Sequence, residues 1–104
     1  MAAGPTERTL QRLRRDGWRA AVVERWNPHA MKRHDLFGVV DVLAIRGGQT
    51  LAVQATSDSN VASRVTKIED SDAIAEIREA GWSLQVWGWR KRKGRWEPRI
   101  VEMS

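Results

Sequence analysis

The sequence predicts a single α/β domain, with antiparallel strands early in the chain, a helical middle and two further strands at the end. Two aliphatic runs, residues 37–45 and 49–56, are joined at Gly47-Gly48, a strong signal for a two-residue β-hairpin turn. An amphipathic segment precedes these runs and another follows them, so helices and strands alternate. A chain of 104 residues can build one modest core but not two, so residues 1–104 are expected to form one domain.

The opening helix and the first strand are predicted from local signals. Thr6 is a good N-cap residue after Pro5, and Gly17 suits the left-handed residue that follows a helix. Residues 18–26 (WRAAVVERW) then predict one strand that ends at a turn-forming Asn-Pro pair, and residues 29–35 (HAMKRHD) predict a polar, basic connector.

The rest of the chain follows the same logic and gives the order αβββαββ. After the hairpin strands, residues 60–68 are predicted to form a helix, and residues 70–81 a second helical stretch or a continuation of the first after a break. Residues 82–92 and 95–103 are predicted as strands, and Pro98 places the last one at a sheet edge.

Composition narrows the class of protein. Eighteen Lys and Arg against thirteen Asp and Glu give a formal net charge of +5, which favours a polyanion such as DNA as partner, although an Arg-rich solvated surface would have the same balance. No cysteine is present, which fits a reducing cytoplasm and excludes a thiolate metal site. Neither a membrane-spanning apolar run nor a signal peptide is recognisable, so we expect a cytoplasmic protein without membrane partners.

Three polar residues interrupt the aliphatic hairpin. With Gly47-Gly48 as the turn, opposed residues have numbers that add up to 95, which places Asp41 opposite Gln54. Thr56 lies on the same sheet face because side chains alternate along a strand. A buried carboxylate needs a partner, and carboxylate and amide oxygens are suitable Mg²⁺ ligands. A plain Asp–Gln hydrogen bond on a partly solvated face is the alternative.

These residues carry a resemblance to a known superfamily. A helix with a Glu, a strand, the pattern D-x12-Q-x-T over a hairpin and a second helix resemble the PD-(D/E)xK nucleases, above all small Holliday-junction resolvases and related phage or restriction-type endonucleases. The resemblance covers residues 6–68. It implies a restriction-endonuclease-like αβββαβ core with a mixed central sheet, here followed by a C-terminal β-hairpin.

The resemblance also implies a metal site. Asp41, Gln54 and Glu7 would hold Mg²⁺ or Mn²⁺, and the metal would help a water to attack phosphorus. Gln54 stands where the family usually has Glu. Thr56 stands where it usually has Lys and supplies no cation. Some families move this cation to the next helix, where Lys67 or Arg64, which share a helical face, would serve here. The alternative is that both are solvated on that face or pair with Glu69 and Asp70.

Two further acidic residues are candidate metal ligands. Six residues of extended strand span about 20 Å, which would put Asp35 too far from Asp41 to share an ion unless a bulge at Gly38 shortens the path. Glu24 would face the site from the neighbouring strand, but exposure near a strand end is the simpler expectation.

Basic residues supply the expected nucleic-acid contacts. One group lies near the proposed site and another in the run WRKRKGRW, where basic residues interleave with aromatic ones. The expected DNA-binding residues are Lys32, Arg33, Arg64, Arg90, Lys91, Arg92 and Lys93. A solvated hairpin that protects an edge strand with Lys and Arg would look similar.

The leading hypothesis is therefore a metal-dependent DNA endonuclease that acts as a homodimer, with selectivity for branched DNA structures as one option. Asp41, Gln54, Thr56, Glu7 and Lys67 would form its catalytic set. Two alternatives stay open: a DNA-binding protein with the same fold whose catalytic set has decayed, and a protein-interaction or assembly subunit that uses surface Trp residues as anchors.

Overall fold

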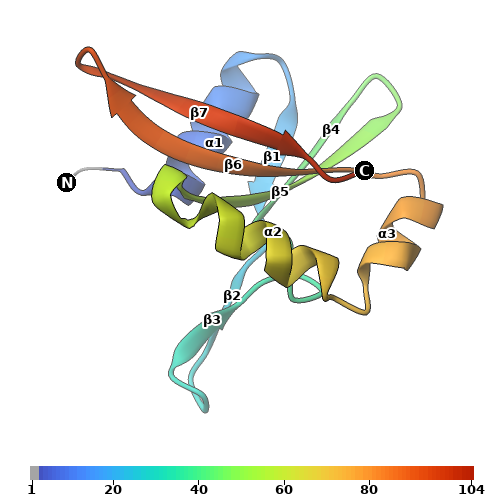
Figure 1. Ribbon diagram of the computed structural model, residues 1–104. Coiled ribbons are helices and arrows are strands. Elements are labelled where there is room, and N and C mark those ends of the chain that lie inside the picture. Colours follow the sequence, from blue (N-terminus) through green and yellow to red (C-terminus); the bar gives the residue numbers. More distant parts are fainter. Residues whose placement is uncertain (1–2) are drawn as a thin grey trace.

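The computed structural model describes residues 3–104 and contains three α-helices, a short 3-10 helix and seven strands (Figure 1). Within these residues, no helix has both the length and the apolar character needed to cross a membrane. In chain order the elements are α1 (Pro5–Arg15), β1 (Arg19–Val22), β2 (Arg25–Asn27), β3 (Lys32–His34), β4 (Val42–Arg46), β5 (Gln49–Ser57), η1 (Asp58–Asn60), α2 (Val61–Glu69), α3 (Ile74–Glu79), β6 (Ser83–Arg92) and β7 (Arg95–Glu102).

Five strands form one mixed sheet in the order β1-β4-β5-β6-β7. The first three pair antiparallel, β6 runs parallel to β5 after the chain crosses over through α2 and α3, and β7 pairs antiparallel with β6. The predicted α/β class with a mixed central sheet is confirmed. The edge position of the strand that contains Pro98 is confirmed as well.

The turn chemistry read from the sequence is also confirmed. Arg46 pairs with Gln49 around the two glycines, both of which have positive φ (56° and 79°), as a tight hairpin turn requires. At the end of α1, Gly17 has a φ of 92°. Its N–H donates to the Arg14 carbonyl, and the next N–H donates to the Leu13 carbonyl, which caps the helix.

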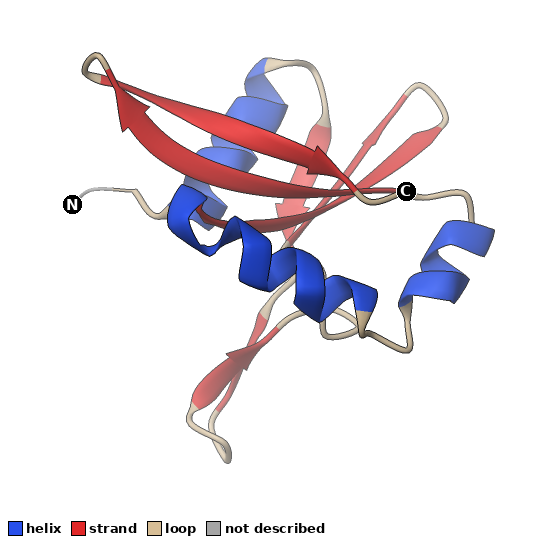
Figure 2. Ribbon diagram, in the orientation of Figure 1, coloured by secondary structure: helices blue, strands red, loops and turns tan. Residues whose placement is uncertain are grey.

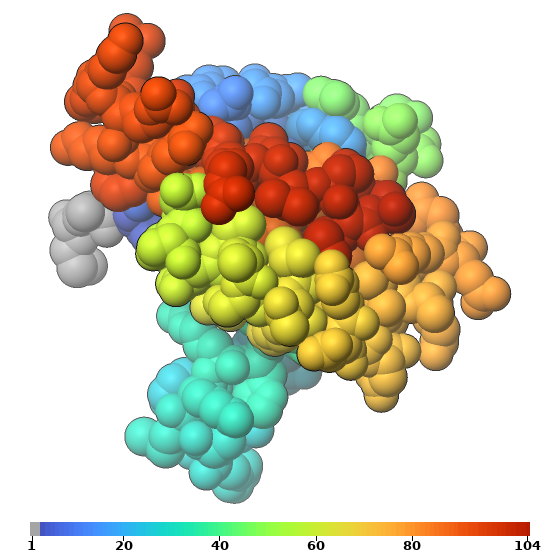
Figure 3. Space-filling view, viewed as in Figure 1, coloured from blue at the N-terminus to red at the C-terminus, as the bar shows by residue number. Residues whose placement is uncertain are grey.

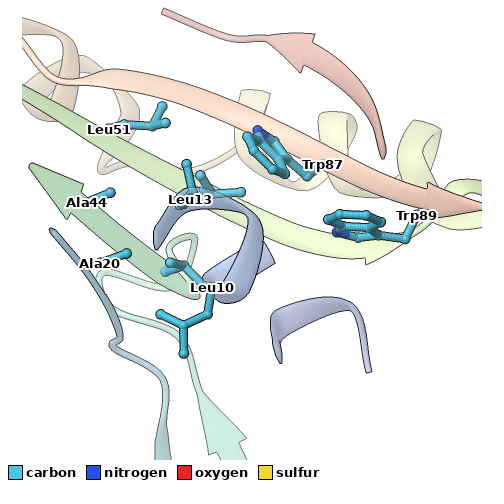
Figure 4. Close-up of a cluster of buried hydrophobic side chains, with 9 residues drawn as sticks. Leu10, Leu13, Ala20, Ala44, Leu51, Trp87 and Trp89 are labelled. Atoms are coloured by element: carbon cyan, nitrogen blue, oxygen red, sulfur yellow. The ribbon is translucent and has the colours of Figure 1, made fainter. Parts of the chain in front are cut away.

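Helices cover both faces of the sheet, with α1 on one side and α2 on the other (Figures 1 and 2). On the α1 side, Leu10 and Leu13 pack against residues that alternate along the strands, among them Trp87 and Trp89 (Figure 4). The Trp89 indole Nε1 also donates to the Thr9 hydroxyl over 2.8 Å inside this core, which fixes α1 on β6.

The opposite face of the sheet packs against α2 and α3. Ile68 and Ile77 of the two helices meet Ala52, Leu84 and Val86 of the central strands. Ala52 and Leu84 are partners on the parallel strands β5 and β6, so the crossover lies directly over them. Because residues 52, 54 and 56 alternate with 51, 53 and 55, Gln54 and Thr56 belong to this α2 side.

The predicted strand over residues 18–26 is wrong in its length, and residues 29–35 are not a plain connector. β1 ends at Val22, because the chain leaves the sheet there. It then forms the separate two-stranded hairpin of β2 and β3, in which Arg25 pairs with His34. This hairpin, residues 25–34, is called the arm below. It projects from the body of the molecule (Figure 3, teal).

The strand predicted over residues 37–45 also begins later than expected. β4 starts at Val42, and residues 36–40 form a tight turn closed by a bridge between Leu36 and Val40. Phe37 and Gly38 have φ values of 54° and 76° in this turn. The turn folds the preceding residues back toward the sheet, with consequences for the candidate site.

Gly88 of β6 allows the closest approach between the sheet and α2. A Cβ at this position would lie 2.1 Å from the Val61 side chain and 3.0 Å from the Asp58 backbone. We therefore expect Gly88→Ala to lower the free energy of unfolding by about 1–3 kcal/mol through overpacking. Urea denaturation measures this change. Gly4→Ala is the control for overpacking, because no atom lies within 4 Å of its added Cβ; since Gly4 is the N-cap of α1, it should lose no more than about 1 kcal/mol. Equal effects of both substitutions would contradict the prediction.

Candidate metal centre

The hairpin brings Asp41 and Gln54 together as the sequence predicted. Val42 pairs with Val53, and one step further the Asp41 N–H donates to the Val53 carbonyl over 2.9 Å. The Gln54 side-chain Nε2 donates to the Asp41 carboxylate over 2.7 Å, and both side chains are buried, with 0% of Gln54 and 4% of Asp41 exposed. The amide and the carboxylate therefore form one buried pair across two adjacent strands.

Lys67 fixes which way the Gln54 amide points. Its ammonium group lies 3.3 Å from the Gln54 Oε1 and can only donate, so the amide oxygen faces Lys67. The amide nitrogen faces the acids and donates to Asp35 over 3.2 Å as well as to Asp41. The Gln54 carbonyl was predicted to be a metal ligand, whereas in the structure the amide hydrogens point toward the carboxylates.

Three acidic side chains meet at this point. Carboxylate oxygens of Glu24, Asp35 and Asp41 all lie within 4.8 Å of one another. These residues are called the acidic cluster below. Glu24 follows β1 and precedes the arm, Asp35 follows the arm, and Asp41 precedes β4. The arm therefore begins and ends at the acidic cluster.

The expectation that Asp35 is too distant from Asp41 is wrong. It assumed an extended chain between them, but the turn over residues 36–40 reverses the path, as a bulge near Gly38 was expected to do in part. Asp35 also forms an ion pair with Lys67, with 3.0 Å between its Oδ2 and the ammonium nitrogen. The expected exposure of Glu24 is wrong too, because its side chain is only 14% exposed.

The other predicted residues divide into those near the cluster and one that is apart from it. Thr56 and Arg64 line a hollow of about 410 Å³ together with the three acids, and Pro5, Thr6, Ala55, Ser57 and Asn60 complete its wall. This is called the acidic hollow below. Glu7 is exposed on α1 and accepts a hydrogen bond from Gln11 over 3.1 Å, so the structure does not bring it into the acidic cluster. The reason is that the Glu7 side chain lies on the solvent-exposed side of α1, although Pro5 and Thr6 at the start of the same helix line the hollow.

Apart from Arg64, the predicted nucleic-acid contacts lie on the arm and at the distal end of β6 and β7. Lys32 and Arg33 are exposed on the arm, and Arg33 pairs with Glu24 over 3.2 Å. At the distal end of β6 and β7, Arg90 and Arg92 both lie within 4 Å of the Glu97 carboxylate. Lys91 pairs with Trp96 across the strands, and Lys93 lies in the turn.

The pKa values of the two aspartates in the acidic cluster are shifted in opposite directions. Burial raises the pKa of Asp41 to about 7, and the neighbouring Asp35 carboxyl adds to this effect, although the Ala55 N–H donates to the Asp41 carboxylate over 2.8 Å. Burial also favours the protonated form of Asp35, but hydrogen bonds with Asp41, Lys67 and Gln54 outweigh it and lower the pKa of Asp35 below its usual value. In the absence of a metal, the two aspartates therefore retain one proton between them up to near-neutral pH.

The donor set fits a hard divalent cation. Three carboxylates offer only oxygen atoms, which Mg²⁺ and Mn²⁺ prefer, and the described residues contribute neither thiolate nor imidazole to the cluster. A cation there would favour the ionised form of Asp41, which burial and the neighbouring Asp35 otherwise disfavour. The geometry thus supports a metal-binding role for Glu24, Asp35 and Asp41, and the metal would compete with a proton.

Comparisons with protein-family models, with curated proteins and with solved structures find no match to this chain.

The raised pKa of Asp41 makes the stability of the metal-free protein depend on pH. Above the usual pKa of an aspartate, the unfolded chain releases the proton that folded Asp41 keeps, so stability falls as pH rises from about 4 to about 7. Asp41→Asn mimics the protonated carboxyl. We expect it to stabilise the protein in chelator, with a gain of up to about 1.4 kcal/mol per pH unit over this window.

Denaturant unfolding at pH 5 and pH 8 measures this gain. Asp58→Asn is the control, because Arg99 lowers the pKa of Asp58 and its removal should give no gain as pH rises. An Asp41→Asn effect that is the same at both pH values would refute the assignment.

Proposed function

We propose that this protein is a divalent-metal-dependent DNA endonuclease of the PD-(D/E)xK type that hydrolyses phosphodiester bonds. The observation that carries the proposal is that two carboxylates and one lysine meet at the buried Gln54 amide, with the Glu24 carboxylate beside the two aspartates. A phosphodiesterase of this kind needs acidic oxygens to hold a metal and a cation beside them to meet phosphate charge.

The order of the core elements supports the proposal. When the arm is set aside, the chain runs through α1, the antiparallel strands β1, β4 and β5, the crossover helix α2 and the parallel strand β6. This is the αβββαβ order that the resemblance implies, with the arm inserted between the first two core strands. The antiparallel pair β6–β7 stands where the C-terminal hairpin was expected.

The residues take roles that differ in part from those the resemblance implies. Asp41 keeps the central metal-binding role, and Glu24 and Asp35 take the place proposed for Glu7 and Gln54. Gln54 becomes a positioning residue that holds Asp41 and Asp35 at its nitrogen and Lys67 at its oxygen. Lys67 supplies the cation that Thr56 lacks.

The remaining groups of the acidic hollow suit phosphate and water. A bound Mg²⁺ or Mn²⁺ would offset charge on the phosphate and lower the pKa of a coordinated water. Arg64 can donate to phosphate oxygens from the wall of the hollow, and the Thr56 hydroxyl can hydrogen-bond a water. The net charge of +5 favours DNA as the polyanion, and a homodimer that cuts both strands stays a prediction.

Metal binding itself gives the first test. Mn²⁺ or Mg²⁺ at about 100 times its dissociation constant should raise the free energy of unfolding by about 2.7 kcal/mol. Glu24→Gln and Asp35→Asn should weaken the affinity measured by calorimetry, because each removes one carboxylate from the cluster. Glu7→Gln is the matched control and should bind like the wild type. A loss of affinity in Glu7→Gln alone would restore the ligand set expected from the sequence.

Cleavage gives the second test. With Mg²⁺ or Mn²⁺, purified protein should cut at least one of branched, single-stranded or duplex DNA, and chelator should stop the reaction. We expect Asp41→Ala and Lys67→Met to lower the rate by about 100-fold or more, since the first removes a carboxylate that would hold the metal and the second removes the cation paired with Asp35. Glu7→Gln should leave the rate unchanged.

If no substrate is cut, or if Asp41→Ala cuts as well as the wild type, the enzyme assignment fails. DNA binding that is indifferent to chelator and to Asp41→Asn would instead identify a binding protein with the same fold.

A further inference from the structure

A second hollow, of about 370 Å³, lies between α1 and the strands β6 and β7, and it is basic. Its wall is formed by Arg8, Gln11, Arg12, Arg15, Trp89 and Trp96. None of these residues belongs to the acidic cluster or to the contacts expected from the sequence. This is called the arginine hollow below.

Aromatic packing holds one of the arginines in place. The guanidinium carbon of Arg8 lies 3.7 Å from the centre of the Trp96 ring. Stacking on an indole face leaves the in-plane N–H groups of a guanidinium free to donate, and it limits the conformational freedom lost when they do. Trp96 is 46% exposed and pairs with Lys91 across the strands, so a further cation borders the same site.

The hollow carries more positive charge than its surroundings neutralise. Among the ion pairs of residues 3–104, only the one between Arg12 and Asp16 involves an arginine of the hollow; none includes Arg8 or Arg15. Like charges one turn apart on a helix repel each other by a few tenths of a kcal/mol per pair. A bound anion would remove this repulsion and would meet donors that are already oriented.

The position of the hollow on α1 links it to the acidic hollow. Pro5 lines the acidic hollow, and residues 5, 8, 12 and 15 are spaced by three, four and three positions, so they follow one stripe of the helix. The stripe begins at the acidic hollow and continues into the arginine hollow. An extended polyanion in one hollow can therefore continue along α1 into the other.

We propose that the arginine hollow binds backbone phosphates of a nucleic-acid strand, away from the phosphate that occupies the acidic hollow. Arg8, Arg12 and Arg15 donate to the phosphate oxygens, and Trp96 positions Arg8. The choice of nucleic acid as the polyanion rests on the proposed function, whereas anion binding rests on the arginine geometry alone.

Salt dependence of binding tests the proposal without requiring cleavage. Affinity for a fluorescent single-stranded DNA oligonucleotide is measured in chelator at several salt concentrations. Each lost phosphate contact should reduce the slope of log affinity against log salt by about 0.7. We expect Arg15→Gln to lower the slope by about this amount, and the combined Arg8→Gln, Arg12→Gln and Arg15→Gln variant to lower it by about 2. Arg19→Gln is the matched control, because Arg19 is exposed on β1 outside the hollow, and its slope should equal that of the wild type.

Conservative substitutions separate charge from structure. The combined Arg8→Lys, Arg12→Lys and Arg15→Lys variant keeps the charge and should keep most of the slope. If Trp96 acts by positioning Arg8, Trp96→Leu should weaken binding in the wild type but add little to Arg8→Gln. Equal losses in the Lys and Gln variants, or a wild-type slope in the folded Gln variant, would overturn the proposal.

The cleavage assay distinguishes this inference from the proposed function. If the protein cuts no DNA but the combined Gln variant has a smaller salt slope, the arginine-hollow proposal stands and the nuclease assignment fails. If the protein cuts DNA but the combined Gln variant keeps the wild-type slope, the nuclease assignment stands and the arginine-hollow proposal fails.

Discussion

A buried side-chain amide needs partners at both of its ends, and in this protein that requirement organises the surrounding structure. The Gln54 nitrogen donates to Asp41 and Asp35, and its oxygen accepts from Lys67, so one amide joins β5 to the chain before β4, to the end of the arm and to α2. Because Gln54 is fully buried, a polar atom of its amide left without a partner would be costly. The amide therefore sets the distance between the crossover helix and the acids that it faces.

The acidic cluster stands out in a chain of net charge +5, and the positive charges are not spread evenly around it. Lys67 contacts Asp35 and Gln54, and Arg33 contacts Glu24, so cations already approach the cluster from α2 and from the arm. Further arginines follow α1 into a separate hollow. Under the proposed function, the carboxylates would hold a metal and the arginines would bind phosphates of the same polyanion. The two sets meet at the first turn of α1.

The arm explains why the sequence predicted only part of the candidate site. Glu24 and Asp35 come together because residues 25–34 form a closed hairpin between them, and the turn over residues 36–40 then folds Asp35 toward Asp41. The Asn-Pro pair and the polar alternation after it are signals of a short hairpin, and acids at both of its ends are a signal of a site at its base. The sequence predicted an extended strand and a connector for these residues, and that prediction leaves Glu24 and Asp35 far apart.

The local chemistry of the chain was sufficient for the class of the fold, the cap at Gly17, the two-glycine turn and the facing pair of Asp41 and Gln54, because each depends on residues close in sequence or on strict strand alternation. The direction of the Gln54 amide, the membership of Glu24 and the exclusion of Glu7 depend instead on how α1, α2 and the arm pack around the sheet. Those contacts join residues many positions apart, and their geometry follows from the packing of whole side chains rather than from any spacing along the chain.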